Sequence, residues 1–145
     1  MDKMMITINA VSEGMITTTK IGKHKLVIDA GAQMGGNDMG PNPLESLLSA
    51  LAACENISAV NAAKEMNFDL QGIDFEITGE LDPRGIMGDS NVRTYFEKVE
   101  IKAIVKTSES DDRLKELQKT VETLCPTYGL FKAANVEMID RWIKA

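Results

Sequence analysis

The stretch "NPLESLLSALAACEN", residues 42–56, decides the fold because it predicts one long helix that neighbouring elements of the fold can approach closely. Pro43 suits the first turn of a helix, where its missing N–H is not needed, and Asn42 is a suitable N-cap. Small residues occupy most of the surface that the leucines leave free, so we expect a central helix that runs to about Met66. The leucines that trace one face are Leu44, Leu47, Leu48 and Leu51.

The residues before this helix predict a sheet. Three segments rich in Ile, Val and Thr read as strands: "MMITINA" (4–10), "GMITTTK" (14–20) and "HKLVIDA" (24–30). The following "GAQMGGNDMGPNP" (31–43) holds four glycines and two prolines, which predicts a loop.

The residues after the helix predict further strands and a second helix. "IDFEITGE" (73–80) and "YFEKVEIKAIVK" (95–106) alternate as antiparallel strands with one buried face, Tyr95 lying on that face, and "LDPRGIMGDSN" (81–91) is a turn-rich connection. Residues 108–134 predict a helix with a cap at Ser108 or Ser110, and "NVEMIDRWI" (135–143) a last strand. The order predicts a single α+β domain, 1–145, with antiparallel sheets packed on a central helix and a second helix. The apolar stripe of that second helix is Leu114, Leu117, Val121 and Leu124.

Composition restricts the partners and the compartment. The 145 residues carry a formal charge of −6, which argues against binding to nucleic acid or to anionic membranes. No apolar run is long enough to cross a bilayer, and "MDKMMITINA" (1–10) does not resemble a secretory leader. We therefore expect a soluble, cytoplasmic protein.

The chain has two cysteines and one histidine. In a reducing compartment two thiols stay reduced by default, and Cys54, Cys125 and His24 are too few for a tetrahedral zinc site made of protein ligands. His24 stands in an alternating segment and is best read as an ordinary strand residue, which disfavours a Cys–His catalytic pair.

The spacing places both thiols toward packed protein. Cys54 lies on the leucine face of the first helix, and Cys125 borders the apolar stripe of the second, so both can be explained as small hydrophobic residues. Pro126 must break the helix directly after Cys125, and a new helix would start there. The N–H groups of Tyr128 and Gly129 would then lie near the Cys125 sulfur, which favours its thiolate.

With these motifs the sequence resembles the family of osmotically inducible protein C (OsmC) and organic hydroperoxide resistance proteins, and most closely its less characterised branch. The resemblance covers nearly the whole chain and rests on "GPNPLESLLSALAAC" (40–54), "GELDPRG" (79–85) and "LCPTYGLF" (124–131). It implies an OsmC-like fold in an intertwined homodimer, with two active sites at the interface and no metal or organic cofactor.

The resemblance also implies a reaction. Cys54 resembles the peroxidatic cysteine, whose thiolate attacks an organic hydroperoxide and becomes a sulfenic acid, and Cys125 resembles the resolving cysteine that forms a disulfide with it. A dithiol reductant, such as a lipoylated protein, would restore both thiols.

The chain departs from the family pattern in its charged residues. The hydroperoxide-reducing branch carries an arginine in its early strands and a glutamate ten residues before the first cysteine, whereas this chain has no arginine before Arg84 and has Leu44 at the latter position. Glu45 and Arg84 are the candidate substitutes, and Glu55, directly after Cys54, would disfavour the thiolate. Alternative cations in the early strands are Lys20, Lys23 and Lys25.

Apolar residues near the cysteines are candidates for substrate contact, although core packing explains them equally well. They are Leu47, Leu48, Leu51, Tyr128 and Phe131. The sequence leaves two alternatives to the peroxidase open: an OsmC-like protein that senses redox state or binds a small ligand without turnover, and a fold in which both cysteines only fill the core.

Overall fold

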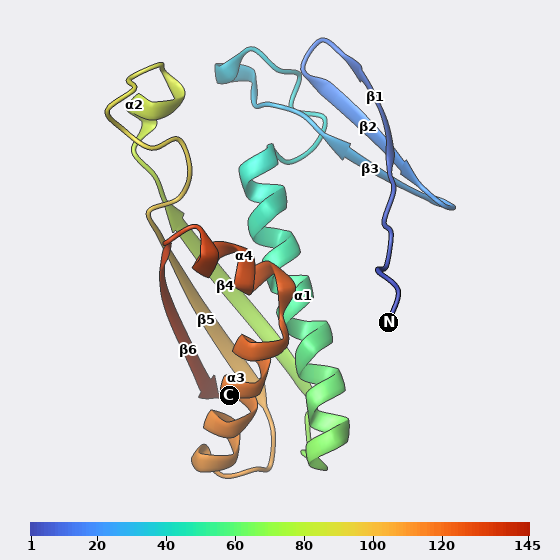
Figure 1. The fold of residues 1–145 in the computed structure, drawn as a ribbon, viewed down its shortest axis with the longest axis vertical. Helices are drawn as coiled ribbons and strands as arrows, with labels where there is room; N and C mark the ends of the chain where they lie inside the picture. Colours follow the sequence, from blue (N-terminus) through green and yellow to red (C-terminus); the bar gives the residue numbers. More distant parts are fainter. The chain divides into compact units, whose positions relative to one another are not determined.

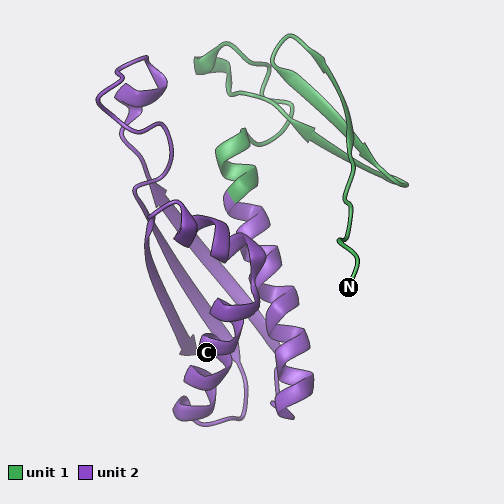
Figure 2. Ribbon diagram, viewed as in Figure 1, with its two compact units in different colours: residues 1–47 green, residues 48–145 purple.

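The computed structural model describes residues 1–145 and shows an α+β fold with two three-stranded sheets (Figure 1). The chain divides into two compact units, residues 1–47 and residues 48–145 (Figure 2). The predicted order of strands, helix, strands, helix and strand is confirmed. None of the helices combines the length and the apolar composition that crossing a membrane requires.

The first unit contains an antiparallel sheet of β1 (Asn9–Glu13), β2 (Ile16–Ile21) and β3 (His24–Ile28). Each hairpin has a two-residue loop, and the first loop residue is a glycine with positive φ: Gly14 at 60° and Gly22 at 58°. A positive φ at this position alone is the requirement of the type II′ turn, which matches the twist of the strands. The glycines therefore fix the register of this sheet.

The predicted first strand at residues 4–10 is largely wrong, because β1 begins only at Asn9. The register pairs Asn9 with Lys20, and β2 ends at Ile21. Residues further toward the N-terminus have no partner strand, and a strand without a partner leaves its backbone groups unpaired. The Ile, Met and Thr content of residues 4–10 could not by itself show where the strand begins.

A loop with a short 3₁₀ helix, η1 (Ala32–Met34), follows β3 as predicted for residues 31–43. Asp29 organises this loop, because its buried carboxylate accepts hydrogen bonds from the backbone N–H groups of Ala30, Asn37 and Met39 at 2.7, 3.1 and 3.0 Å. These bonds favour the charged form and lower the pKa of Asp29.

The long helix α1 (Pro43–Met66) has the predicted bounds. Asn42 and Glu45 form a capping box: the Asn42 side chain accepts from the Glu45 N–H at 2.8 Å, and the Glu45 carboxylate accepts from the Asn42 N–H at 3.0 Å. Beyond Leu48 the buried face of α1 is built mostly of small residues, so the helix can approach its neighbours closely. That face is Leu51, Glu55, Ser58, Ala59, Ala62 and Ala63.

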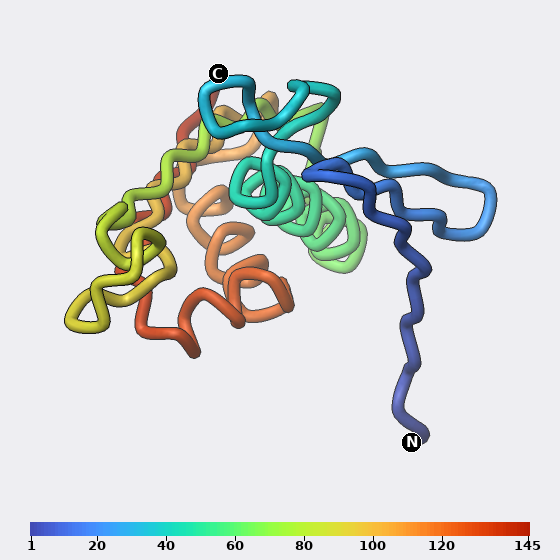
Figure 3. The backbone as a smooth tube through the Cα atoms, turned by 90° about the horizontal axis from the view of Figure 1, so that it is seen from above, coloured from blue at the N-terminus to red at the C-terminus, as the bar shows by residue number.

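The second unit contains a sheet with the order β4 (Gly72–Glu80), β5 (Lys98–Lys106) and β6 (Glu137–Lys144). The pair β4–β5 is antiparallel, as predicted, whereas β5–β6 is parallel, so the prediction of antiparallel sheets is wrong for this pair. Alternate side chains of β5 are fully buried, which marks one face of the sheet as the core face. Both α1 and α3 (Asp111–Leu124) lie on one face of this sheet (Figures 1 and 3).

A parallel pair requires a crossover connection, and α3 together with α4 (Pro126–Ala133) supplies it. Ser110 caps α3 by accepting from the Arg113 N–H at 3.2 Å, in line with one of the two predicted caps. Leu114, Leu117 and Val121 are buried as predicted, whereas Leu124 is 55% exposed because the helix ends there.

Two details of the β4–β5 connection differ from the prediction. The connection contains a short helix, α2 (Pro83–Ile86), capped by Asp82. Strand β5 begins at Lys98 rather than at Tyr95, and Tyr95 is exposed whereas Phe96 is buried. The alternation of the strand does not extend to its first predicted residues.

Candidate active site

The second unit brings the two cysteines together. Cys54 lies on α1 at the edge of its buried face and is half-buried, whereas Cys125 is only 2% exposed. The thiols of Cys54 and Cys125 interact with each other directly. The two sulfurs, 71 positions apart in the sequence, are therefore neighbours, and one of them is the more accessible.

Cys125 stands at the break between α3 and α4. Its N–H still completes the last turn of α3 by donating to the Val121 carbonyl at 2.9 Å, and its side chain caps α4 by accepting from the Tyr128 N–H at 3.4 Å. Pro126 occupies the first position of α4, where no N–H is needed. The predicted helix break and the predicted Tyr128 contact are both confirmed.

The new helix start does not, however, favour the Cys125 thiolate. Burial, assisted by the neighbouring Cys54 and Glu55, raises the pKa of Cys125 to about 12 although the Tyr128 N–H opposes the shift. The expectation of a thiolate at Cys125 was therefore wrong, because one weak hydrogen bond does not compensate for desolvation of a thiolate. Cys125 is a protonated thiol at neutral pH.

The start of α4 acts on Cys54 instead. Burial alone would raise the pKa of Cys54, but the hydroxyl and the backbone N–H of Thr127 and the thiol of Cys125 interact with its sulfur and lower the pKa. Thr127 is the second residue of α4, so its N–H has no partner within the helix. The free N–H groups at the start of α4 thus interact with both sulfurs. The Thr127 N–H interacts with Cys54, and the Tyr128 N–H interacts with Cys125.

Three carboxyl groups form a cluster, and one of them, that of Glu55, lies beside the cysteines. Glu55 on α1 is fully buried, and its neighbours are Asp140 on β6 and Glu122 on α3. Burial, with repulsion from Asp140, Glu122 and Cys54, raises the pKa of Glu55 to about 8. Glu55 is therefore mostly protonated at neutral pH, and the expectation that its charge opposes the Cys54 thiolate does not hold there.

The other members of this carboxyl cluster, Asp140 and Glu122, accept hydrogen bonds from neighbouring side chains. Burial and the adjacent Glu122 raise the pKa of Asp140 to about 7, although the Trp142 indole N–H donates to its carboxylate at 2.9 Å. The Gln118 amide donates to Glu122 at 3.1 Å and to the Asp140 carbonyl at 2.8 Å. The Tyr128 phenol is buried beside the same three carboxyls, and burial raises its pKa.

Glu45 and Arg84 have other contacts in this chain. Glu45 lies in the first unit and caps α1. Arg84 lies on α2, where its guanidinium donates to Asp82 at 3.0 Å and pairs with it at 2.5 Å. No hydrogen bond or ion pair connects Arg84 to either cysteine, and the groups that lower the pKa of Cys54 are all neutral.

The five apolar residues differ in exposure. Leu47 is 41% exposed and Leu48 is half-buried, whereas Leu51 is fully buried in the core. Tyr128 and Phe131 are buried on α4, and the Phe131 ring packs against Phe96 with centroids 6.1 Å apart.

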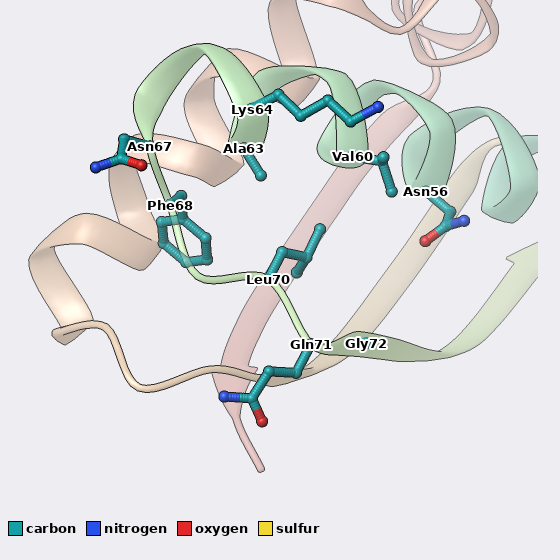
Figure 4. A pocket seen from close by; sticks show the side chains of 9 residues that line it. All are labelled: Asn56, Val60, Ala63, Lys64, Asn67, Phe68, Leu70, Gln71 and Gly72. Atoms are coloured by element: carbon teal, nitrogen blue, oxygen red, sulfur yellow. The ribbon is translucent and has the colours of Figure 1, made fainter.

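A hollow of about 310 Å³ lies near the C-terminal end of α1 and includes neither cysteine (Figure 4). Figure 4 shows Phe68 and Leu70 from the connection to β4 opposite Val60 and Lys64 of α1. We assign no chemistry to it, because it is open and Lys64 is its only charged side chain. Its lining is Asn56, Val60, Ala63, Lys64, Asn67, Phe68, Leu70, Gln71 and Gly72.

Sequence reasoning missed Thr127, Glu122 and Asp140. Asp140 could have been found, because it alternates with Met138 and Trp142 in the last strand and must share their buried face. Glu122 and Thr127 carried no such signal, since their roles depend on how α3 and α4 meet α1.

Comparison with known proteins identifies the family. A profile of OsmC-like proteins matches residues 35–138, which include both cysteines. The chain belongs to the OsmC-like protein family. No functionally curated protein matches the sequence.

Solved structures share the OsmC-like fold over almost the whole chain. An OsmC-like protein from Mycoplasma pneumoniae has a TM-score of 0.86 at 21% identity, over 100% of this chain and 99% of that one. An organic hydroperoxide resistance protein OsmC from Legionella pneumophila has a TM-score of 0.73 at 19% identity, over 97% and 98% of the two chains. A putative organic hydroperoxide resistance protein from Vibrio cholerae, with captopril bound in one of its active sites, has a TM-score of 0.70 at 17% identity, over 97% and 93%. At these identities the likeness establishes the fold alone.

Proposed function

We propose that this OsmC-like protein is a thiol-dependent peroxidase that reduces organic hydroperoxides. The observation that carries the proposal is the pair of adjacent sulfurs with opposite properties. Cys54 is the more accessible and has a lowered pKa, whereas Cys125 is buried with a pKa of about 12. A peroxidatic thiol must be an accessible thiolate, and a resolving thiol must stay unreactive until its partner is oxidised. Structural neighbours named organic hydroperoxide resistance proteins agree with this function.

The reaction has three steps in this proposal. The Cys54 thiolate attacks the distal oxygen of the hydroperoxide, so that an S–O bond forms, the O–O bond breaks and the alkoxide leaves as an alcohol after gaining a proton. The Cys125 sulfur then attacks the Cys54 sulfenic acid, forming the S–S bond and releasing water. A dithiol reductant, such as a lipoylated protein, reduces the disulfide by exchange.

We assign the remaining predicted site residues to supporting roles. Arg84 and Glu45 are the candidate cation and its acceptor, and each would have to exchange its present partner, Asp82 or the start of α1, to act there. Leu47 and Leu48 are candidates for direct substrate contact because they are not fully buried. The buried residues Leu51, Tyr128 and Phe131 would pack against the site without contacting the substrate.

We further propose that the working form is a homodimer. The α1 face opposite the sheet carries exposed apolar side chains, with Ile57 and Val60 exposed by 61% and 38%. Val11 and Leu26 of the first sheet are also exposed, by 75% and 44%. Apolar area of this kind is typical of surfaces that a partner covers. Sedimentation analysis should show a dimer, and Ile57→Lys should weaken it; a monomer at micromolar concentration would contradict this assignment.

A redox-sensing or ligand-binding protein remains the second candidate, because only neutral groups lower the pKa of Cys54. Without a nearby cation the developing alkoxide lacks electrostatic stabilisation, and turnover would be slow. The peroxidase and the redox sensor differ in catalytic cycling rather than in disulfide formation, whereas a ligand-binding protein need not form the disulfide.

Steady-state turnover separates them. The peroxidase proposal expects continuous loss of cumene hydroperoxide with dihydrolipoamide as reductant, and a return to the uncatalysed rate in Cys54→Ser. A single oxidation event without cycling would support the sensor. Equal rates in the parent protein and Cys54→Ser would exclude the peroxidase.

A further inference from the structure

Glu55 is buried in a way that an ionised carboxylate does not tolerate. Its side chain is fully buried, and neither of its carboxyl oxygens has a hydrogen-bond partner. An unpaired buried charge is strongly unfavourable, so such a group keeps its proton instead. This chain alone encloses both oxygens of Glu55. A cation from outside therefore cannot reach them to pair with the charge and stabilise it.

None of the groups that shift the pKa of Glu55 is positively charged. The titratable neighbours are Cys54 on its own helix, Glu122 on α3, Cys125 and Tyr128 at the start of α4, and Asp140 on β6. The core face of β5 contributes only apolar side chains, namely Val99, Ile101, Ala103 and Val105.

The neighbouring carboxyls increase this preference for the neutral form. Asp140 opposes Ile101 in the parallel register, so it shares the core face of the sheet with that residue. One of its carboxyl oxygens, Oδ2, is buried without a hydrogen-bond partner. Three carboxyls from α1, α3 and β6 thus meet, with Glu55 beside the two sulfurs, and they cannot all ionise at low energetic cost.

We propose that Glu55 is a positioning residue that stays protonated beside the Cys54–Cys125 pair. The neighbouring carboxyls of Glu122 and Asp140 favour this neutral form because they would repel a charge on Glu55. While Glu55 is neutral, Cys54 ionises beside it without repulsion. When Glu55 loses its proton, its charge opposes the thiolate at both sulfurs. Glu55 acts through the cysteines and does not contact the substrate. Its part in turnover rests on the proposed peroxidase function, whereas its effect on the thiols does not.

The test is a titration of the Cys54 thiolate by its ultraviolet absorbance in a Cys125→Ser background, without peroxide. Two coupled groups titrate together, so the parent curve should extend over a wider pH range than a single group gives. Glu55→Gln keeps the shape and neutrality of the side chain and should give a one-proton curve with its midpoint at lower pH. Glu65→Gln, at an exposed position of the same helix, should leave the curve unchanged.

Two measurements keep the test decisive if Glu55→Gln fails to fold. Asp140→Asn should move the second step of the parent curve to lower pH, because it removes a negative neighbour of Glu55. Infrared difference spectra of the unmodified protein should show the C=O stretch of a protonated carboxylic acid at neutral pH that disappears at alkaline pH. Identical thiolate curves in the parent and Glu55→Gln, or no protonated carboxyl at neutral pH, would overturn the proposal. A normal titration effect without peroxide turnover would instead refute the proposed function alone.

Discussion

Thr127, at the second position of α4, presents both its hydroxyl and its backbone N–H to the sulfur of Cys54. This relationship links the two helices that carry the cysteines, and it explains why the pKa of Cys54 is lowered without a nearby cation. The helix break at Pro126 is what places the N–H there, since the N–H groups of a first helical turn have no partner within the helix.

Replacing Thr127 by valine should weaken the Cys54 thiolate. Valine keeps the shape of the side chain and the backbone N–H but removes the hydroxyl. A hydrogen bond to a charged group contributes about 1.5–3 kcal/mol, so we expect the thiolate fraction at neutral pH to fall by about 10- to 150-fold. Alkylation by iodoacetamide as a function of pH measures this fraction.

The matched control is Thr123→Val, at an exposed position of α3 whose hydroxyl donates to the Lys119 carbonyl at 3.0 Å. It should leave the alkylation profile of Cys54 unchanged. If both valine variants behave alike, the Thr127 hydroxyl has no specific effect on the sulfur.

Glu55 should make the protein less stable as pH rises. Its pKa is raised from an ordinary 4.5 to about 8, so the folded state binds the proton more tightly than the unfolded state. The stabilisation is complete below 4.5 and is lost as pH rises through about 8. At 1.36 kcal/mol per pKa unit, the loss is at most about 5 kcal/mol.

Urea unfolding at several pH values measures this slope. Glu55→Gln should flatten the dependence over the neutral range, although the raised pKa of Asp140, about 7, leaves part of it. Glu65→Gln should keep the parent slope. A Glu55→Gln protein with the same slope as the parent would show that Glu55 is already ionised in the folded state.

Gly79 should be intolerant of a side chain. A Cβ at this position of β4 would collide with the ring of Phe96, which packs against Phe131 of α4. Overpacking of this kind costs about 1–3 kcal/mol, so we expect Gly79→Ala to lower the free energy of unfolding by that amount. Because α4 carries Thr127, the reactivity of Cys54 should change as well.

Gly72→Ala in the same strand is the control, since its Cβ would lie 3.9 Å from Lys106 in ordinary contact. It should leave stability and thiol reactivity close to those of the parent. A Gly79→Ala protein as stable as Gly72→Ala would mean that Phe96 can move without cost.

The sequence could predict most elements of the fold because their patterns are local. The bounds of α1 follow from Asn42, Pro43 and the capping Glu45, and the break at Pro126 follows from its missing N–H. The first strand could not be located, because its start depends on where β2 ends. The parallel direction of β6 also depends on a crossover that no local pattern specifies.

The candidate site could be predicted only in part. Its two cysteines follow from their motifs, but which of them has the lower pKa depends on burial and on contacts between helices. From the sequence we expected a thiolate at Cys125 and a charged carboxylate at Glu55. Burial raises the pKa of both groups, so both are mainly protonated at neutral pH. Desolvation is a property of the packed structure, so spacing in one helix cannot supply it.

The proposed chemistry of the two sulfurs is tested by treating the reduced protein with one equivalent of cumene hydroperoxide and mapping its thiols by mass spectrometry. We expect a disulfide between Cys54 and Cys125, and in Cys125→Ser a sulfenic acid at Cys54 that dimedone traps. Two free thiols after peroxide consumption, or oxidation at Cys125 with Cys54 intact, would contradict it.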